Sequence, residues 1–421
     1  MKTVKICSVL ILTMLLCLWG CEKDQFISDE LDREISYDAK KGGGGGKPGS
    51  GTDGITIRDL GAPAGTWSRA NGIALIGGDI YVVGVAEALS GENHAFLWTE
   101  ANGWQDLGYL HEEYPYSEAM DIGSNGIITG WSSSIIPPFF SNNAVTWSAQ
   151  NPSAGPVSIN PTSSVNSSAQ VINTHGDIAG SRVDTCGYNG YGDCSPGSPG
   201  GTTSIWSAFL WQANGNYVDV GTLGGDSWVT GINDAGILTG YSEMHKGDFD
   251  LRAFVWQQGN FQILPGLENL WSRSYDMNGA GQIVGEFDTL SGMISSQSAI
   301  RGFISGPNES GVWETQKLPT LGKRTIAYAI SESGYVTGTT WAQKPNPKGR
   351  NQFDIVPFLY RDDIGIFNLG AFNKGGRGDG FDIIENTQDI IIVVGSGDVQ
   401  GSRHALMWTI DLCALIPGTC S

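Results

Sequence analysis

The sequence has few of the residues, and none of the short motifs, that mark common catalytic centres. Its 421 residues include five histidines, which are scattered along the chain. No G-x-S-x-G elbow, H-E-x-x-H motif or Gly-rich phosphate loop is present. Carboxylate pairs that cleave glycosides could still meet across distant segments, and spacing along the chain does not reveal such pairs. The sequence therefore names no catalytic residue and no metal ligand.

Positive charge is also scarce. The chain has 24 Lys and Arg residues against 43 Asp and Glu residues, which gives a net charge of −19 at neutral pH. Such a surface repels a polyanion, because nucleic-acid binding requires clustered basic side chains that neutralise phosphates. We expect no nucleic-acid partner, whereas neutral glycans, cationic surfaces and proteins remain open as ligands.

A long apolar run is missing as well. The N-terminal apolar stretch, Ile6–Leu18, follows two lysines and is too short to span a bilayer, so residues 1–20 are typical of a signal peptide. Leu18, Gly20 and Cys21 resemble a bacterial lipobox, whose cysteine is lipidated and becomes the mature N-terminus. The acidic residues that follow resemble the export signal of Bacteroidetes surface lipoproteins. An ordinary secretory signal is the alternative. We expect a surface-exposed protein anchored to the outer membrane through Cys21.

Residues 21–54 lack apolar periodicity and contain an acidic patch followed by the glycine run Gly42–Gly46. Such a segment cannot bury enough apolar surface to offset chain entropy, so we expect a lipidated, flexible tether. A coil of this length spans about 30 Å on average, which would hold the following domain away from the membrane.

Four of the seven cysteines lie beyond the tether, as two close pairs. Outside the cytoplasm such pairs favour disulfides. Cys186 with Cys194 would stiffen a surface connection, and Cys413 with Cys420 would fix residues 413–421 as a C-terminal tail. The CxxC spacing of zinc sites is absent, which disfavours a metal at these cysteines.

Glycine is abundant. Seven of the glycines recur at an average interval of about 52 residues and mark an internal repeat. Before most of the marker glycines lies a tight turn rich in Asn and Gly. After most of them comes a short aromatic run such as His94–Trp98, followed by a D-L-G run such as Asp106–Gly108. The marker glycines are Gly84, Gly130, Gly180, Gly240, Gly285, Gly338 and Gly395.

Four short β-type runs in each of seven repeats predict an all-β fold over residues 55–412, a seven-bladed β-propeller of four-stranded antiparallel blades. A β-solenoid is the rival fold, but its coils are usually shorter. The first recognisable run, Ile55–Gly61, is of the D-L-G type, and the last, His404–Trp408, is of the aromatic type. We therefore expect the N-terminal strand to complete the last blade, which would close the ring and remove an exposed sheet edge.

The repeated motifs resemble the HAF family of extracellular repeats. The likeness is carried by the HAFLW run of His94–Trp98, by the D-L-G runs, and by the intervening pattern S-x-A-x-x-I-N-x-x-G-x-I-x-G. The resemblance covers nearly all of the chain after the tether. It implies an extracellular repeat protein with a propeller-like fold, and it carries over no catalytic residue.

The connections between strands are unequal in length. In an up-and-down blade, successive connections alternate between the two faces of the disk. Those after the first and third strands are short, whereas those after the second and fourth strands are long. We expect one plain face and one elaborated face. The long connections include Trp131–Asn143, Ser181–Ser207, Glu286–Ile300 and Thr339–Val356.

Tryptophans outside the repeat register fall in or beside these long connections and should gather on the elaborated face. Exposed aromatic rings suit the recognition of sugars or proteins, because they offer a large contact area at little entropic cost. The alternative is that each ring fills the core beneath its own loop. The ligand-binding candidates are Trp67, Trp131, Trp206, Trp228, Trp271 and Trp341.

Calcium is a weaker alternative among cofactors. Asp248 with Asp250, and Asp184 with Asp193, offer oxygen ligands, but neither pair follows a calcium-loop pattern. Solvated loop charge is the better interpretation, so we expect no cofactor.

Two functions from different classes remain. The first is a monomeric, surface-anchored binding or adhesion module that recognises a glycan or an extracellular protein through its tryptophan-bearing face. The second is a polysaccharide-active hydrolase or lyase on the same scaffold, because propellers support both roles. A purely structural envelope protein is a third, less favoured reading.

Overall fold

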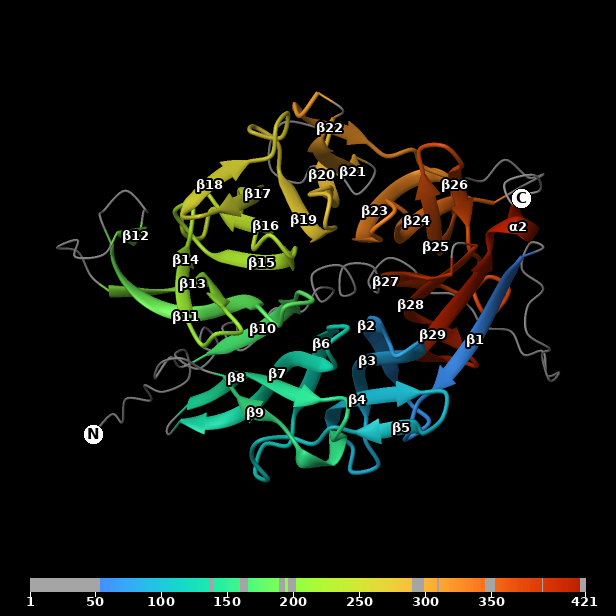
Figure 1. Cartoon of the computed structure of the whole chain (residues 1–421), viewed down its shortest axis with the longest axis horizontal. Coiled ribbons are helices and arrows are strands. Elements are labelled where there is room, and N and C mark those ends of the chain that lie inside the picture. The colour runs from blue at the N-terminus through green and yellow to red at the C-terminus, as the bar shows by residue number, and fades with distance from the viewer. Residues whose placement is uncertain are drawn as a thin grey trace, which may run out of the picture.

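The computed structural model describes residues 54–136, 139–159, 166–188, 194–195, 202–289, 299–308, 310–344, 353–387 and 389–416. These residues form seven antiparallel sheets that follow one another around a ring (Figure 1). Helix is confined to two short pieces, η1 (Pro152–Ala154) and α2 (Leu412–Leu415). Among the described residues, no helix has the length and apolar character needed to cross a bilayer.

Each sheet is one blade, and its four main strands are arranged in order from the centre of the ring to its outside. Blade 1 contains β2 (Ser68–Ile76), β3 (Asp79–Glu87), β4 (Asn93–Thr99) and β5 (Gly103–Asp106). Blade 2 contains β6 (Ser117–Ile122), β7 (Ile127–Ile136), β8 (Phe139–Ser148) and β9 (Val157–Ser158). Blade 3 contains β10 (Ser167–Ile172), β11 (Ile178–Tyr188), β13 (Thr202–Trp211) and β14 (Tyr217–Gly221), with β12 (Cys194–Ser195) added to β11. Blade 4 contains β15 (Ser227–Ile232), β16 (Leu238–Glu243), β17 (Leu251–Gln257) and β18 (Asn260–Ile263).

The remaining blades follow the same order. Blade 5 contains β19 (Ser272–Met277), β20 (Ile283–Asp288), β21 (Ile300–Pro307) and β22 (Trp313–Lys317). Blade 6 contains β23 (Gly322–Ile330), β24 (Val336–Gln343), β25 (Phe353–Arg361) and β26 (Gly365–Asn368). Blade 7 contains β27 (Gly378–Thr387), β28 (Ile390–Val399), β29 (Ser402–Asp411) and, from the other end of the domain, β1 (Ile55–Gly61).

Strand β1 closes the ring. It pairs with β29 in antiparallel register from Ile55 opposite Ile410 to Gly61 opposite Ala405. The predicted seven-bladed propeller, completed by its N-terminal strand, is confirmed. Because β1 is the outer strand of blade 7, the first and last parts of the domain are held together by main-chain hydrogen bonds.

The marker glycines are required by a bulge in every inner strand. In blade 4 the register shifts between Val229 and Gly231, directly opposite Gly240. A Cβ atom on Gly240 would lie 1.9 Å from the carbonyl oxygen of Trp228. The other six marker glycines face the same clash, with distances of 1.9 to 2.0 Å to a backbone oxygen. Only glycine fits, which explains why this residue recurs in each repeat.

A serine at the start of most inner strands joins neighbouring blades. The Ser117 hydroxyl donates to the carbonyl oxygen of Gly108 at 2.7 Å, and it accepts the N–H of Ala95 at 2.9 Å. Ser68 makes the same pair of bonds to Gly61 and Ala405 across the closure of the ring. The serine of one repeat thus meets the aromatic and D-L-G runs of the preceding repeat, so the three motifs form one interface.

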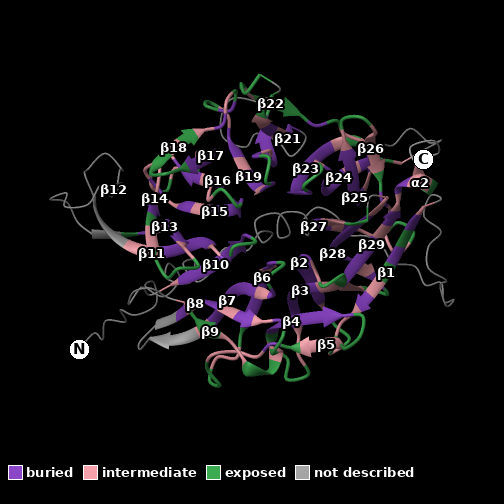
Figure 2. Cartoon of the chain, viewed as in Figure 1, coloured by how far each residue is buried: buried purple, intermediate pink, exposed green. Residues whose placement is uncertain are grey.

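Buried apolar residues line the interfaces between blades. The D-L-G leucines Leu107 and Leu369 are 1% exposed, and Trp408 of the last aromatic strand is fully buried. The inner strands are largely buried, whereas exposed residues gather in the outer strands and turns (Figure 2). The core is therefore a ring of inter-blade layers, as the repeat pattern predicts.

The two faces of the ring differ as expected. We call the face that carries the turns after the first and third strands the plain face, and the opposite one the long-connection face. Three predicted loops are instead partly or largely continued strands, and one of them is Thr339–Val356, which β24 and β25 enter from its two ends. β7 and β8 extend through most of Trp131–Asn143, and β11 and β13 take up much of Ser181–Ser207. Polar and β-branched residues there continue the hairpin pairing, so the elaboration of blades 2 and 3 consists of long hairpin arms.

Both ends of the ring lie on the plain face. β1 begins there and β29 ends there, because Ile55 pairs with Ile410. The N–H of Asp411 donates to the carbonyl oxygen of Gly54 at 2.7 Å, which fixes the chain where it enters the ring. The described chain therefore begins, at Gly54, on the plain face.

The bulge predicts the effect of one added methyl group. Gly240→Ala should lower the free energy of unfolding by about 3 kcal/mol or more, because the new Cβ overlaps a backbone oxygen that cannot move without breaking the sheet. Urea unfolding measures the change. The exposed Ser153→Ala is a control that should stay within about 0.5 kcal/mol of wild type. An equally small loss in Gly240→Ala would contradict the steric explanation.

Candidate functional site

The six candidate tryptophans all lie toward the long-connection face, one in each of blades 1 to 6. Trp67 and Trp271 stand just before inner strands, as predicted for connections. The other four lie within strands rather than in loops, two of them near a strand end and two near the middle of a long strand. They are Trp131 in β7, Trp206 in β13, Trp228 in β15 and Trp341 in β24.

The structure separates Trp271 from the other five. Trp271 is only 5% exposed, and the Arg273 guanidinium lies 4.8 Å from its ring centroid. Its indole is part of the packing between blades and is not an accessible surface, which corrects its inclusion among the exposed candidates. The remaining five are half-buried. Trp228 lies 5.1 Å from the Tyr241 ring and packs at the edge of the cluster that contains Trp271.

Trp341 illustrates how a half-buried ring is held. Its ring centroid lies 6.3 Å from that of Phe353, and the Lys323 ammonium lies 5.2 Å from it. Such contacts fix the orientation of the indole and leave part of it accessible to a ligand. The six tryptophans are therefore distributed around the face. Within the described residues, the hydrophobic clusters join only Trp228 and Trp271.

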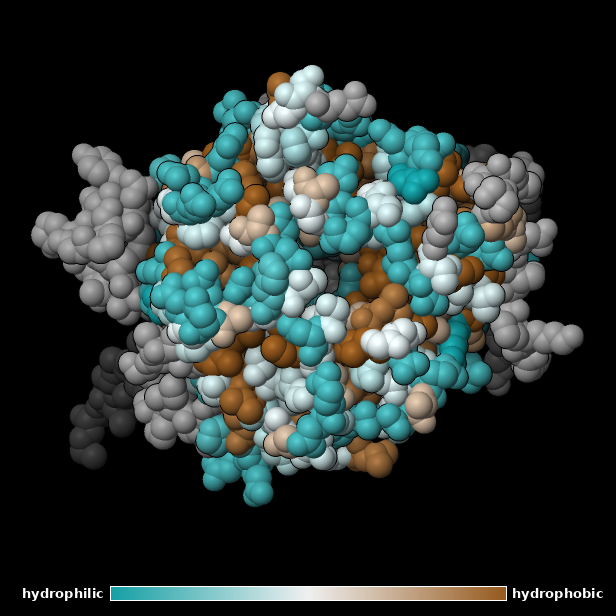
Figure 3. Space-filling view, viewed as in Figure 1, coloured by the Kyte–Doolittle hydropathy of each residue, from teal (hydrophilic) through white to brown (hydrophobic). Residues whose placement is uncertain are grey.

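Three exposed apolar side chains on the same face were missed by the tryptophan pattern. Leu89 is 89% exposed, Phe249 is 65% exposed and Tyr116 is 42% exposed. Phe249 has a positive φ of 56°, which is unusual for a bulky residue. On the face shown in Figure 3, hydrophobic residues are interspersed among hydrophilic ones and do not form one continuous patch.

A buried ionic network lies between blades 5 and 6. Glu286, which is 1% exposed, accepts a hydrogen bond from the Tyr275 hydroxyl at 2.7 Å and pairs with Arg324 at 3.3 Å. Burial, together with the negative charge of Glu286, raises the pKa of Tyr275 well above its usual value. The phenol therefore stays protonated and acts as a donor. Because tyrosine and glutamate are both enclosed, the network stabilises the blade interface and offers no accessible nucleophile.

Three carboxylates on inner strands link blades near the axis of the ring. Asp382 accepts the N–H of Ile383 at 2.7 Å and that of Ile73, in the next blade, at 2.8 Å. Asp121 and Asp276 make equivalent bonds to the blades that follow them. Burial and the negative charges of Asp121 and Asp276 raise the pKa of Asp382 well above its usual value. These carboxylates accept main-chain donors, which is a structural role, and the hydrolase alternative stays a prediction.

The histidines of the aromatic runs contact the aspartates of the D-L-G runs. His94 Nδ1 lies 2.7 Å from Asp106, and His404 Nδ1 lies 3.1 Å from Asp59. These contacts explain why the two motifs occur together, and they support the structural reading of both histidines. Within the described residues, no group of three or more His, Cys, Asp or Glu side chains is arranged to hold a metal.

The residues considered for calcium are engaged elsewhere. Asp250 pairs with Arg252 at 2.8 Å, and Asp248 accepts the N–H of Asp250 at 2.9 Å. Asp184 pairs with Arg182 at 2.9 Å, and Asp193 lies outside the described residues. Asp250 and Asp184 are thus ion-paired, whereas Asp248 accepts a backbone N–H.

The anchor and disulfide candidates lie largely beyond the described part of the chain. Residues 1–53, with Cys21, fall outside it. Cys194 pairs with Tyr188 through the backbone, but the side chains of Cys186 and Cys194 are not described. Cys413 is disulfide-bonded, and its predicted partner Cys420 lies outside the described residues. The lipid anchor and the pairings therefore stay predictions.

No protein-family model matches this chain, and no curated protein matches it. Among solved structures, it is similar to the β-propeller domain of the Trilobed protease from Pyrococcus furiosus, with 10% identity, a TM-score of 0.49, and coverage of 84% of this chain and 98% of the other. It is also similar to a Trypanosoma rangeli sialidase, with 10% identity, a TM-score of 0.38, and coverage of 86% and 58%. A protein of unknown function from Dyadobacter fermentans gives 9% identity, a TM-score of 0.37, and coverage of 84% and 99%. Likenesses this distant carry no information about activity.

Sequence reasoning also missed a groove on the plain face between blades 5 and 6. A signal for it was present in the repeat register. Where five blades have tryptophan at the end of the aromatic run, blade 5 has Ser305 and blade 6 has Tyr360. Departures from a repeat at a packing position leave space that the other blades fill.

The buried network gives a test of its structural role. Glu286→Ala should lower the free energy of unfolding by about 3 to 5 kcal/mol, because Arg324 would be left as an uncompensated buried charge. Thermal and urea unfolding measure the loss. The exposed Glu112→Ala, which removes the same group from the surface, should have little effect. Full stability of Glu286→Ala would show that the carboxylate is not structural.

Proposed function

We propose that this chain is an extracellular, surface-anchored binding or adhesion module that recognises a glycan or a protein through its long-connection face. The observation that carries the proposal is the direction in which the closing strand β1 runs through the ring. Because β1 starts on the plain face, a tether attached to Gly54 approaches the ring from that side. An anchor at Cys21 would then turn the long-connection face away from the membrane.

The chemistry of that face supports recognition. It carries five half-buried tryptophans and the exposed side chains of Leu89, Phe249 and Tyr116. Rings that are fixed by neighbours but partly accessible give contact area at little entropic cost. The plain face, in contrast, is built from short turns whose polar groups bond to one another between blades, as Thr174 does to Asp234.

Three features of the chain support an extracellular location. The N-terminal lipobox-like sequence, the disulfide-bonded Cys413 and the resemblance to HAF repeats all agree with export. The net charge of −19 disfavours polyanions, which leaves neutral glycans and protein surfaces as ligands.

Substitution of the rings tests the face. On a glycan array and a panel of extracellular matrix proteins, the full chain should bind at least one ligand. Trp228→Ala and Trp341→Ala should each lower that affinity about tenfold or more, because each removes a partly accessible indole from the outward face. Wild-type silence on both panels, or unchanged binding by both variants, would contradict the proposal.

Trp313→Ala provides the matched control. Trp313 is also half-buried, but it begins β22 on the plain face. Its loss should leave affinity for the same ligand unchanged if the long-connection face is the contact surface. An equal loss in Trp313→Ala would indicate a general effect on folding.

Replacement of the anchor residue tests attachment. In the native host, Cys21→Ser should abolish incorporation of radiolabelled fatty acid and move the protein from the membrane fraction to the soluble fraction. Cys17→Ser, which alters a nearby cysteine of the signal segment, is the control and should leave the distribution unchanged. Continued acylation of Cys21→Ser would rule out Cys21 as the lipid-bearing residue.

A further inference from the structure

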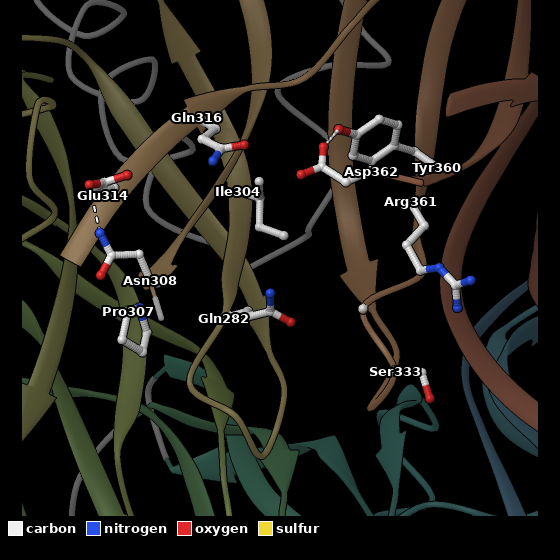
Figure 4. A pocket seen from close by; sticks show the side chains of 12 residues that line it. Gln282, Ile304, Pro307, Asn308, Glu314, Gln316, Ser333, Tyr360, Arg361 and Asp362 are labelled. Carbon is white, nitrogen blue, oxygen red and sulfur yellow. Dashed lines mark hydrogen bonds between the residues drawn. The ribbon is translucent and has the colours of Figure 1, made fainter. Parts of the chain in front are cut away.

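A polar groove opens on the plain face between blades 5 and 6. Its volume is about 190 Å³, well below the roughly 300–1,000 Å³ of sites for drug-sized ligands. One wall comes from blade 5 and includes Gln282, Ile304 and Gln316, and the other comes from blade 6 and includes Tyr360 and Asp362 (Figure 4). The space suits one small, compact ligand.

Two residues that line the groove are smaller than their equivalents in blade 4. Tyr360 pairs with Val336 in the register at which Trp256 pairs with Leu238 in blade 4, so a phenol replaces an indole at this interface. On the facing wall, Gly306 has no side chain, where blade 4 has Gln257. Tyr360 and Gly306 leave open a volume that a tryptophan and a glutamine at these two positions would occupy.

Hydrogen-bonding groups on the walls are available to a ligand. The side-chain amide of Gln316 makes no hydrogen bond to any described residue. The Gln282 side-chain oxygen accepts from Asn278 at 2.9 Å, which orients the amide and leaves its two N–H donors for other partners. Glu314 receives one bond from Asn308 at 2.8 Å and keeps further acceptor capacity.

The Tyr360 side is oriented in the same way. Its hydroxyl donates to Asp362, and burial together with this carboxylate raises the pKa of Tyr360, so the phenol remains a neutral donor. The ring belongs to the buried cluster against which Ile304 packs, and the two residues form an apolar floor. The groove therefore combines an apolar base with amide and carboxylate groups at its rim.

The charge of the walls selects against anions. Glu314 and Asp362 contribute negative charge, while the guanidinium of Arg361 is paired with Asp363. A sugar ring matches this arrangement. Its C–H face can lie on the apolar floor, and its hydroxyls can donate to carboxylates and accept from amides.

We propose that the groove between blades 5 and 6 binds a neutral sugar residue. The site lies on the opposite face from the tryptophans and does not depend on the function proposed for them. A sugar bound there would lie on the side of the ring from which the tether leaves. Asp362 and Glu314 accept its hydroxyls, Gln282 and Gln316 donate to it, and Tyr360 supports its ring.

The test measures binding of glucose, galactose, mannose and N-acetylglucosamine to the full chain by saturation-transfer NMR and calorimetry. At least one of these neutral sugars should bind, and glucuronate should bind more weakly than glucose. Tyr360→Trp restores the repeat residue, fills the groove and should lower the affinity at least about tenfold without loss of thermal stability. Gln316→Ala, at an exposed side chain, should lower it about fivefold to tenfold.

Gln262→Ala is the matched control, because Gln262 pairs with Val255 in blade 4 as Gln316 pairs with Ile304 in blade 5. It should bind the sugar as wild type does. The proposal is overturned if none of the four neutral sugars binds, if glucuronate binds more tightly than glucose, or if Tyr360→Trp and Gln316→Ala both retain wild-type affinity.

Discussion

The ring depends on a steric constraint that is repeated once in every blade. Each inner strand bulges so that a backbone carbonyl oxygen lies within 2.0 Å of the place where a Cβ would stand on the adjacent strand. Glycine is the one residue that permits this approach. The bulge increases the local twist of the blade. Ahead of it in blade 2, Ser117 makes its two hydrogen bonds to the neighbouring blade. The blade interfaces, with their buried leucines and tryptophans, are assembled around this point.

The same constraint explains what the sequence could predict. Gly240 and its equivalents are fixed by backbone geometry, and Ser117 is fixed by two hydrogen bonds between blades, so their spacing reports the repeat directly. Closure by Ile55–Gly61 followed from the order of motifs at the two ends. The accessibility of the candidate rings could not be predicted. Trp67 and Trp271 both stand just before an inner strand, yet Trp271 is enclosed in a cluster of buried side chains and Trp67 is half-buried.

The groove shows a second limit of prediction from the sequence. The exchange of tryptophan for Tyr360 is visible in the sequence, but its consequence depends on what faces it from the next blade. Only the structure reveals that Gly306 and Ile304 of β21 and Gln316 of β22 line an open space beside Tyr360. Departures from a repeat identify where a scaffold has been modified, and the facing residue determines whether the result is a void or a site.

The position of β1 has a mechanical consequence. Inter-strand hydrogen bonds run perpendicular to the strands, and β1 enters the ring at its plain face. A load applied to the chain at Gly54 along the direction of β1 therefore acts across the whole row of these bonds. All of its bonds to β29 are then sheared together instead of being unzipped one at a time. A strand pair of this geometry resists traction best when the load at Gly54 runs along β1.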